Sequence, residues 1–177
     1  MKIRDIKEQI RNFFFVNPSV KMRVRQIERG LKLPIPSVIR YTKELEKEGI
    51  LKREKIAEAV LFSADRASKS FLLQKKLYNI KLLYESGLIE YLINEFSNPI
   101  LIVFGSYSKG EDNENSDIDL YIQTPSKKEI KLERFEKLLK RKIQVFIHSN
   151  LKQIKNPNLM NNIINGIPLN NFLEVFV

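Results

Sequence analysis

The chain has 177 residues, of which 43% are hydrophobic and 29% charged, a globular composition that accommodates one or two domains. Its 31 Lys and Arg exceed its 21 Asp and Glu, and the net charge of +10 favours polyanionic partners. The absence of cysteine excludes disulfides, thiolate zinc sites and cysteine nucleophiles. No apolar run is long enough to span a bilayer and the first residues lack a signal-peptide pattern, so we expect a cytoplasmic protein without a membrane partner.

The first 65 residues predict three helices followed by a two-stranded hairpin, because apolar side chains recur first with helical and then with strand spacing. Gly30 is the predicted C-cap of the second helix, and Pro36 suits the first position of the third. The predicted elements are a helix through Ile3 to Phe14, a short helix from Val24, a helix over 37–48, and strands at 50–53 and 59–62 around a polar tip.

This order of elements resembles the winged helix-turn-helix of archaeal and bacterial regulators, most clearly over residues 37–51. The resemblance implies that the third helix enters the major groove of duplex DNA, where phosphates position the protein and base edges specify the sequence. The residues expected to contact DNA are Ser37, Arg40 and Lys43 on that helix and Lys52 and Arg53 in the wing.

The charge of this region agrees with a nucleic-acid partner. Residues 1–65 hold 15 Lys and Arg against 9 Asp and Glu, a net +6 in about a third of the chain. The alternative is a winged helix used for protein contacts or dimerisation, which the acidic residues Glu44, Glu46 and Glu48 on the third helix keep open.

The rest of the chain predicts helices and strands in alternation. Residues 66–97 are expected to form linking helices interrupted at Ser86-Gly87. The apolar run 100–104 predicts a buried strand, the alternating stretch 117–123 a second strand, and 142–147 a third. A charged helix is expected over 129–140, with Glu129, Glu133 and Glu136 on its solvated face.

The polar segment between the first two of these strands carries the candidate chemistry. Gly105 would let the backbone approach phosphate oxygens closely, and the Ser106 hydroxyl could donate a hydrogen bond to them. Asp117 and Asp119 alternate along a strand, so both carboxylates face one side about 6 to 7 Å apart. Two hard oxygen ligands beside a phosphate cradle suit Mg²⁺, which neutralises charge that develops during nucleotidyl transfer.

The residues Gly105-Ser106, Gly110 and Ser116-Asp117-Ile118-Asp119-Leu120 closely resemble the signature of the minimal nucleotidyltransferases of the DNA polymerase β superfamily. The resemblance extends over roughly Phe71 to Phe172 and implies an α/β fold with a mixed sheet flanked by helices. It also implies transfer of a nucleoside monophosphate from a nucleoside triphosphate, with ATP expected, to a hydroxyl acceptor. The implied roles are catalysis and Mg²⁺ binding for Asp117 and Asp119, and nucleotide binding for Gly105, Ser106, Lys109 and Ser116.

The third carboxylate that the family places on a neighbouring strand is absent, because the matching position holds Gln144. An amide oxygen can coordinate a cation, but it carries no charge and cannot act as a general base. Three interpretations therefore stay open: a weakly active enzyme with two acids, a domain that binds nucleotide without chemistry, and a scaffold.

The sequence thus predicts an α/β protein with a winged helix DNA-binding domain at 1–65, linking helices at 66–97 and a nucleotidyltransferase-like domain at 98–177. Its leading predicted function is a DNA-binding regulator that carries nucleotidyltransferase activity. The alternative is a catalytically inactive nucleotide-binding or antitoxin-like regulator, for which the resemblance implies a small helical toxin as partner. A homodimer is a further candidate assembly.

Overall fold

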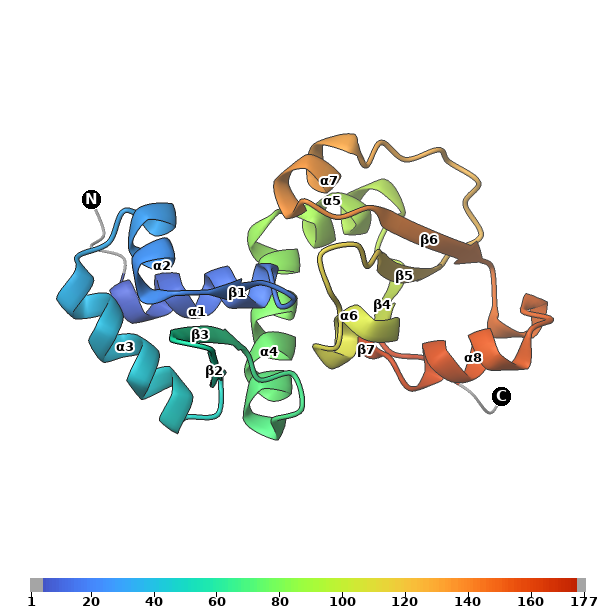
Figure 1. The fold of residues 1–177 in the computed structure, drawn as a ribbon. Coiled ribbons are helices and arrows are strands. Elements are labelled where there is room, and N and C mark those ends of the chain that lie inside the picture. The colour runs from blue at the N-terminus through green and yellow to red at the C-terminus, as the bar shows by residue number, and fades with distance from the viewer. Residues whose placement is uncertain (1–4, 175–177) are drawn as a thin grey trace. The chain divides into compact units, whose positions relative to one another are not determined.

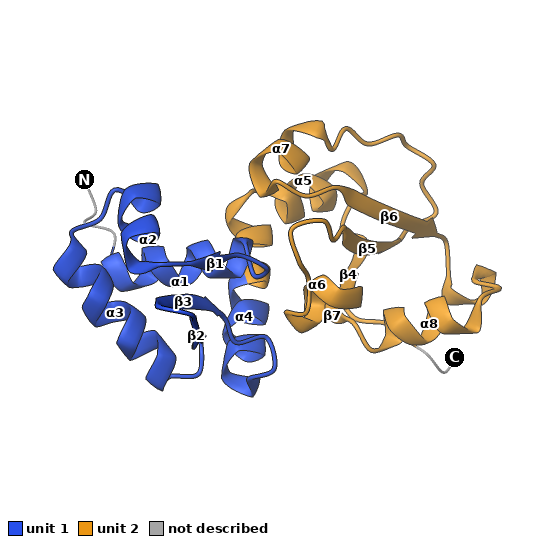
Figure 2. Cartoon of the chain, in the orientation of Figure 1, with its two compact units in different colours: residues 1–78 blue, residues 79–177 orange. Residues whose placement is uncertain are grey.

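The computed structural model describes residues 5–174 and divides the chain into two compact units, Met1–Tyr78 and Asn79–Val177 (Figure 2). The boundary between them falls within the long helix α4 (Lys69–Glu85). The predicted packing of Ile3 lies outside the described residues. Within residues 5–174, no helix is both long and apolar enough to cross a membrane.

The first unit combines three helices with a small antiparallel sheet (Figure 1). Its core contains the buried faces of all three helices and of the sheet, with Phe14, Ile27, Val38 and Leu45 each inaccessible to solvent. In chain order the elements are α1 (Ile6–Val16), β1 (Lys21–Met22), α2 (Val24–Leu31), α3 (Ile35–Lys47), β2 (Leu51–Ile56) and β3 (Ala59–Ala64). The strand order is β1-β3-β2.

Three details of this unit differ from the sequence-based expectation. Gly30 lies inside α2, and the helix ends instead at Lys32, which adopts a left-handed conformation. The hairpin strands continue to Ile56 and resume at Ala59, because ladder pairing with the facing strand extends through the polar residues 54–56. The two-residue strand β1 was not predicted, since it is too short to show a periodic pattern.

The second unit is a mixed four-stranded sheet with helices, which confirms the predicted mixed α/β architecture. The strand order is β6-β5-β4-β7, with β5 and β6 parallel and the other two pairs antiparallel. After α4 the elements are α5 (Leu88–Glu95), β4 (Ile100–Phe104), α6 (Gly105–Lys109), β5 (Ile118–Gln123), α7 (Glu133–Leu139), β6 (Ile143–His148), a short 3₁₀ turn (Leu151–Gln153), α8 (Pro157–Ile164) and β7 (Ile167–Asn170).

The two faces of this sheet bury different sets of side chains. Ile118 and Leu120 of β5 pack with α5 and α7, as the alternation of that strand predicts. Tyr121 points to the opposite face and packs with Ile163 of α8. Asp119 alternates with Ile118 and Leu120, so it lies on the same face of the sheet as Tyr121. Near Tyr121 this face packs against α8.

Two elements of the second unit were predicted incompletely. The helix α7 begins at Glu133, so residues 129–132 are not helical. The strand β7 was not predicted because Pro168 and Asn170 give its four residues a loop-like composition, and its ladder partner β4 lies more than 60 positions earlier in the chain.

Candidate functional site

The Asp119 carboxylate lies against Gly105 at the end of β4. A Cβ atom on Gly105 would lie 2.3 Å from Asp119 Oδ2, closer than non-bonded atoms approach. Gly105 also has a φ of +70°, a left-handed conformation that disfavours any other residue. This glycine was predicted to allow a close approach of phosphate; in the structure it is the Asp119 carboxylate that already requires the absence of a side chain.

The neighbouring strand places Gln144 directly beside Asp119. β5 and β6 run parallel with Asp119 opposite Gln144 in the ladder, so both side chains emerge on the same face. Gln144 is exposed and Asp119 is half-buried. The register therefore brings the amide of Gln144 to the position at which a third carboxylate was expected from the family pattern.

The surroundings of Asp119 disfavour its ionised form. Burial raises the pKa of Asp119, and the nearby Asp117 carboxylate raises it further. Asp117 precedes β5 and is exposed. A positive charge placed beside the Asp119 carboxylate would stabilise its ionised form.

The other predicted nucleotide-binding residues lie on α6 and in the loop that precedes β5. Ser106 is half-buried and Lys109 is exposed, both on the short helix α6 that directly follows β4. The Ser116 hydroxyl accepts a hydrogen bond from the Asn113 amide at 3.0 Å, and so stabilises the loop that leads to Asp117. Ser116 thus has a structural contact in addition to any contact with a ligand.

A buried polar network that the sequence analysis missed supports this loop. The Asp112 carboxylate, 1% exposed, accepts a hydrogen bond of 2.7 Å from Asn79 Nδ2. Asn79 also donates to the Tyr107 carbonyl at 2.9 Å, and Arg141 Nη2 lies 3.9 Å from Asp112 Oδ2. Asn79 of α4 therefore contacts both α6 and the loop before β5, and Arg141 of the turn before β6 lies near the same Asp112 carboxylate. Asp112 was overlooked because it lies in a polar run, 111–117, that resembles a solvated loop.

The network also settles the role of Tyr107 in the fold. Tyr107 is 3% exposed, and its hydroxyl donates to the Asn79 carbonyl at 3.4 Å. The side chain is therefore packed inside the unit rather than presented as a platform for a base.

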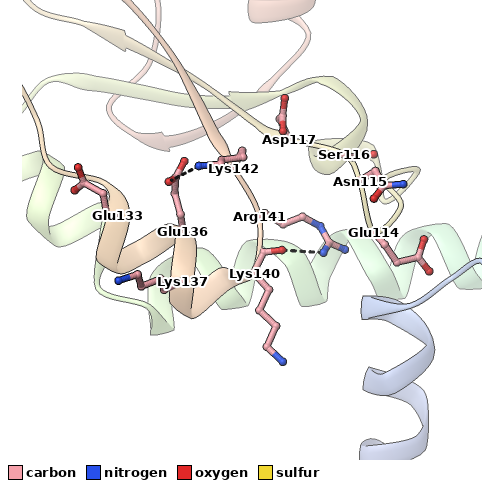
Figure 3. A pocket seen from close by; sticks show the side chains of 10 residues that line it. All are labelled: Glu114, Asn115, Ser116, Asp117, Glu133, Glu136, Lys137, Lys140, Arg141 and Lys142. Atoms are coloured by element: carbon pink, nitrogen blue, oxygen red, sulfur yellow. Dashed lines mark hydrogen bonds and ion pairs between the residues drawn. The ribbon is translucent and has the colours of Figure 1, made fainter.

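A pocket of about 490 Å³ opens beside Asp117 and Ser116 and extends along α7 to residues 140–142 (Figure 3). On its wall, Glu136 accepts a hydrogen bond of 3.0 Å from the Ile143 amide and forms an ion pair of 3.3 Å with Lys142. The hydrogen bond from the Ile143 amide lowers the pKa of Glu136, and the nearby Lys142 ammonium lowers it further. Glu136 therefore anchors the start of β6 instead of forming a purely solvated face, and neither Asp119 nor Gly105 lines this pocket.

The acidic residues available for a metal are few. Across residues 5–174, no three His, Cys, Asp or Glu side chains are grouped closely enough to hold a metal ion. The hard oxygen donors at the end of the sheet are the carboxylates of Asp117 and Asp119 and the amide oxygen of Gln144, a set that suits one Mg²⁺ completed by substrate phosphates and water.

The candidate DNA-contacting residues lie in the other unit, on α3 and β2. Arg40, Lys43, Lys52 and Arg53 are exposed and Ser37 is half-buried. Three of the four cations have acidic partners: the charged groups are 2.8 Å apart for Arg40 and Glu44, 3.3 Å for Lys52 and Glu54, and 3.4 Å for Arg53 and Glu46.

A comparison with protein families finds a match within the second unit. Residues 86–169 match the family model described as a nucleotidyltransferase domain. The matched range begins just before α5, reaches into β7 and includes Asp117, Asp119 and Gln144, which confirms the nucleotidyltransferase part of the resemblance. A search of the curated proteins found no match to the chain, and neither did a search of the solved structures.

Proposed function

We propose that the nucleotidyltransferase domain binds a nucleoside triphosphate, ATP in the first instance, together with Mg²⁺ at Asp117 and Asp119. The observation that carries this proposal is the placement of the Asp119 carboxylate against Gly105, with Gln144 beside it in the ladder. Ser106 and Lys109 on α6 are the candidate phosphate ligands. Magnesium, when bound, would neutralise charge on the phosphates of the substrate.

The proposed reaction is slow transfer of a nucleoside monophosphate. The oxygen of an acceptor hydroxyl forms a bond to the α-phosphorus, the bond from that phosphorus to the bridging oxygen breaks, and pyrophosphate leaves. The hydroxyl proton passes to solvent, because the Gln144 amide cannot accept it. A general base typically contributes about 10² to 10⁴-fold to such a step, and this chain lacks one at the expected position.

The test compares wild type, Gln144→Asp, and Gln144→Asp combined with Asp119→Asn, using ATP labelled on the α-phosphate and the full chain. We expect weak or undetectable labelling of protein or added nucleic acid by wild type, at least a tenfold gain in Gln144→Asp, and loss of that gain in the double variant. Strong transfer by wild type that Gln144→Asp does not improve would contradict the assigned role of position 144.

The alternative, a catalytically inactive nucleotide-binding or antitoxin-like regulator, is favoured by the same neutral residue. It would bind ATP with Mg²⁺ and give no transfer in any of the three proteins. A small helical toxin would be its protein partner, and pull-down from a lysate followed by identification of the bound protein tests that pairing.

We also propose that residues 1–65 form a winged helix that binds duplex DNA. The supporting observation is the arrangement of α3, which buries Val38 and Leu45 in the core and leaves Ile39, Arg40 and Lys43 exposed on the opposite face. The β2–β3 hairpin would be the wing. Titration of a fluorescent duplex with the full chain tests the proposal, and undetectable binding at low salt would contradict it.

A further inference from the structure

The positive charge of the N-terminal unit is concentrated on one short stretch. Residues 21–32, which include β1 and α2, hold five Lys and Arg and one Glu, a surplus of +4. Residues 33–65, which include α3 and the hairpin, hold six Lys and Arg and six Asp and Glu, and therefore carry no net charge. The elements expected to contact DNA are thus electrically balanced, whereas the element that precedes them is not.

Helix α2 is amphipathic, with an apolar face packed in the core and a basic face exposed. Val24, Ile27 and Leu31 pack into the core of the unit. Arg25 and Arg29 lie four residues apart and so share another face of the helix, whereas Lys32 is the left-handed C-cap that follows Leu31. All three side chains are exposed. Figure 1 shows α2 immediately before α3 in the chain.

The cations of α2 also differ from Arg40, Lys52 and Arg53 in their partners. Among the described residues, no acidic side chain lies within ion-pair distance of Arg25, Arg29 or Lys32. Arg40 and Arg53, in contrast, each have a glutamate partner. A paired cation must give up or share its carboxylate to bind a phosphate, whereas an unpaired one displaces only mobile counterions.

We propose that Arg25 and Arg29 on α2, with Lys32 at its C-cap, form the principal phosphate-binding surface of this protein, for the backbone of duplex DNA. The proposal rests on the DNA binding proposed above and assigns most of its salt-dependent affinity to α2. At 1.5 Å per residue, Arg25 and Arg29 lie about 6 Å apart along the helix axis, and Lys32 follows the end of the helix. One DNA strand presents a phosphate every ~3.4 Å of its own axis. The two guanidinium groups can each hold a phosphate with two hydrogen bonds.

The test uses the full chain and two triple variants that remove the same charge. The first is Arg25→Gln, Arg29→Gln and Lys32→Gln, and the second is Arg40→Gln, Lys52→Gln and Arg53→Gln. Affinity for a fluorescent duplex is measured by anisotropy at several NaCl concentrations, after circular dichroism has confirmed that both variants are folded. The readout is the slope of log K against log salt, which reports the number of phosphates contacted.

Each phosphate contact contributes about 0.9 to this slope. We expect the α2 variant to lose about 3 from the slope and the α3 and β2 variant to lose less than 1. If wild type binds and the α2 variant keeps the same slope, or if both variants lose equally from the slope, the assignment to α2 is overturned while the proposed DNA binding stays in place. Absence of binding by wild type at low salt would overturn both. Tighter binding of a duplex RNA through the same three residues would overturn DNA as the ligand.

Discussion

Substitution of Gly105 by alanine is expected to damage the candidate site in two separable ways. The first is backbone strain, because a φ of +70° costs a non-glycine residue roughly 1–2 kcal/mol. The second is the collision with Asp119, whose Oδ2 would be 2.3 Å from the new Cβ. If the carboxylate moves away into a strained rotamer, the additional cost is about 0.5–1.5 kcal/mol.

The chain offers a matched control for the first contribution. Gly87 has a φ of +74°, and a Cβ atom there would meet no heavy atom within 4 Å. Gly87→Ala therefore reports backbone strain alone, roughly 1–2 kcal/mol. Both glycines belong to unit Asn79–Val177, so both report on the unfolding of the same unit.

The collision is isolated by repeating the substitution in an Asp119→Ala background. Without the carboxylate, the nearest remaining Asp119 atom is its Cβ, 3.6 Å from the new methyl group, an ordinary contact. Urea unfolding of the metal-free proteins, followed by circular dichroism, should show Gly105→Ala costing about 1 kcal/mol more in wild type than in Asp119→Ala. Equal costs in both backgrounds would refute the contact between Gly105 and Asp119.

Two further outcomes follow from the supporting residues. Asp112→Ala removes the buried acceptor of Asn79 and leaves Arg141 without this carboxylate. Thermal unfolding should therefore show a loss of about 3–5 kcal/mol in the free energy of unfolding. A loss below about 1 kcal/mol, as at an exposed site, would contradict the buried network. The pKa of Glu136 is lowered in the folded chain, so its ionised form contributes stability that is present above the pKa of the unfolded chain and is lost as pH falls through the folded value. Glu136→Gln should therefore lower Tm at pH 7 and have a smaller effect at pH 3; an equal shift at both values would show that the carboxylate charge does not matter.

Local patterns in the sequence were sufficient for the elements that carry the site. The three strands predicted at 100–104, 117–123 and 142–147 are present to within one residue at each end, because each is dominated by its own periodic side chains. Asp117, expected on the second of them, instead precedes β5. The neighbourhood of Asp119 and Gln144, which the resemblance implied, is present in the ladder of β5 and β6.

Features that depend on distant contacts could not be predicted in the same way. Asp112 is buried only because Asn79, more than 30 positions earlier, approaches it, and nothing in its own polar run distinguishes it from a solvated residue. β7 exists because β4 pairs with it. The ion pairs of Arg40 and Arg53 likewise depend on side-chain geometry, so counting cations could not separate them from the unpaired cations of α2.

Calorimetric titration of ATP into the full chain, with and without Mg²⁺, tests the proposed nucleotide site at its defining residues. The comparison is between wild type and a variant with both Asp117→Asn and Asp119→Asn, which keeps the size of each side chain and removes its charge. We expect wild type to bind ATP only when Mg²⁺ is present and the double variant to lose that metal-dependent binding. Equal affinity in the two proteins, or binding by wild type that is indifferent to Mg²⁺, would contradict the assignment of a metal-dependent nucleotide site to Asp117 and Asp119.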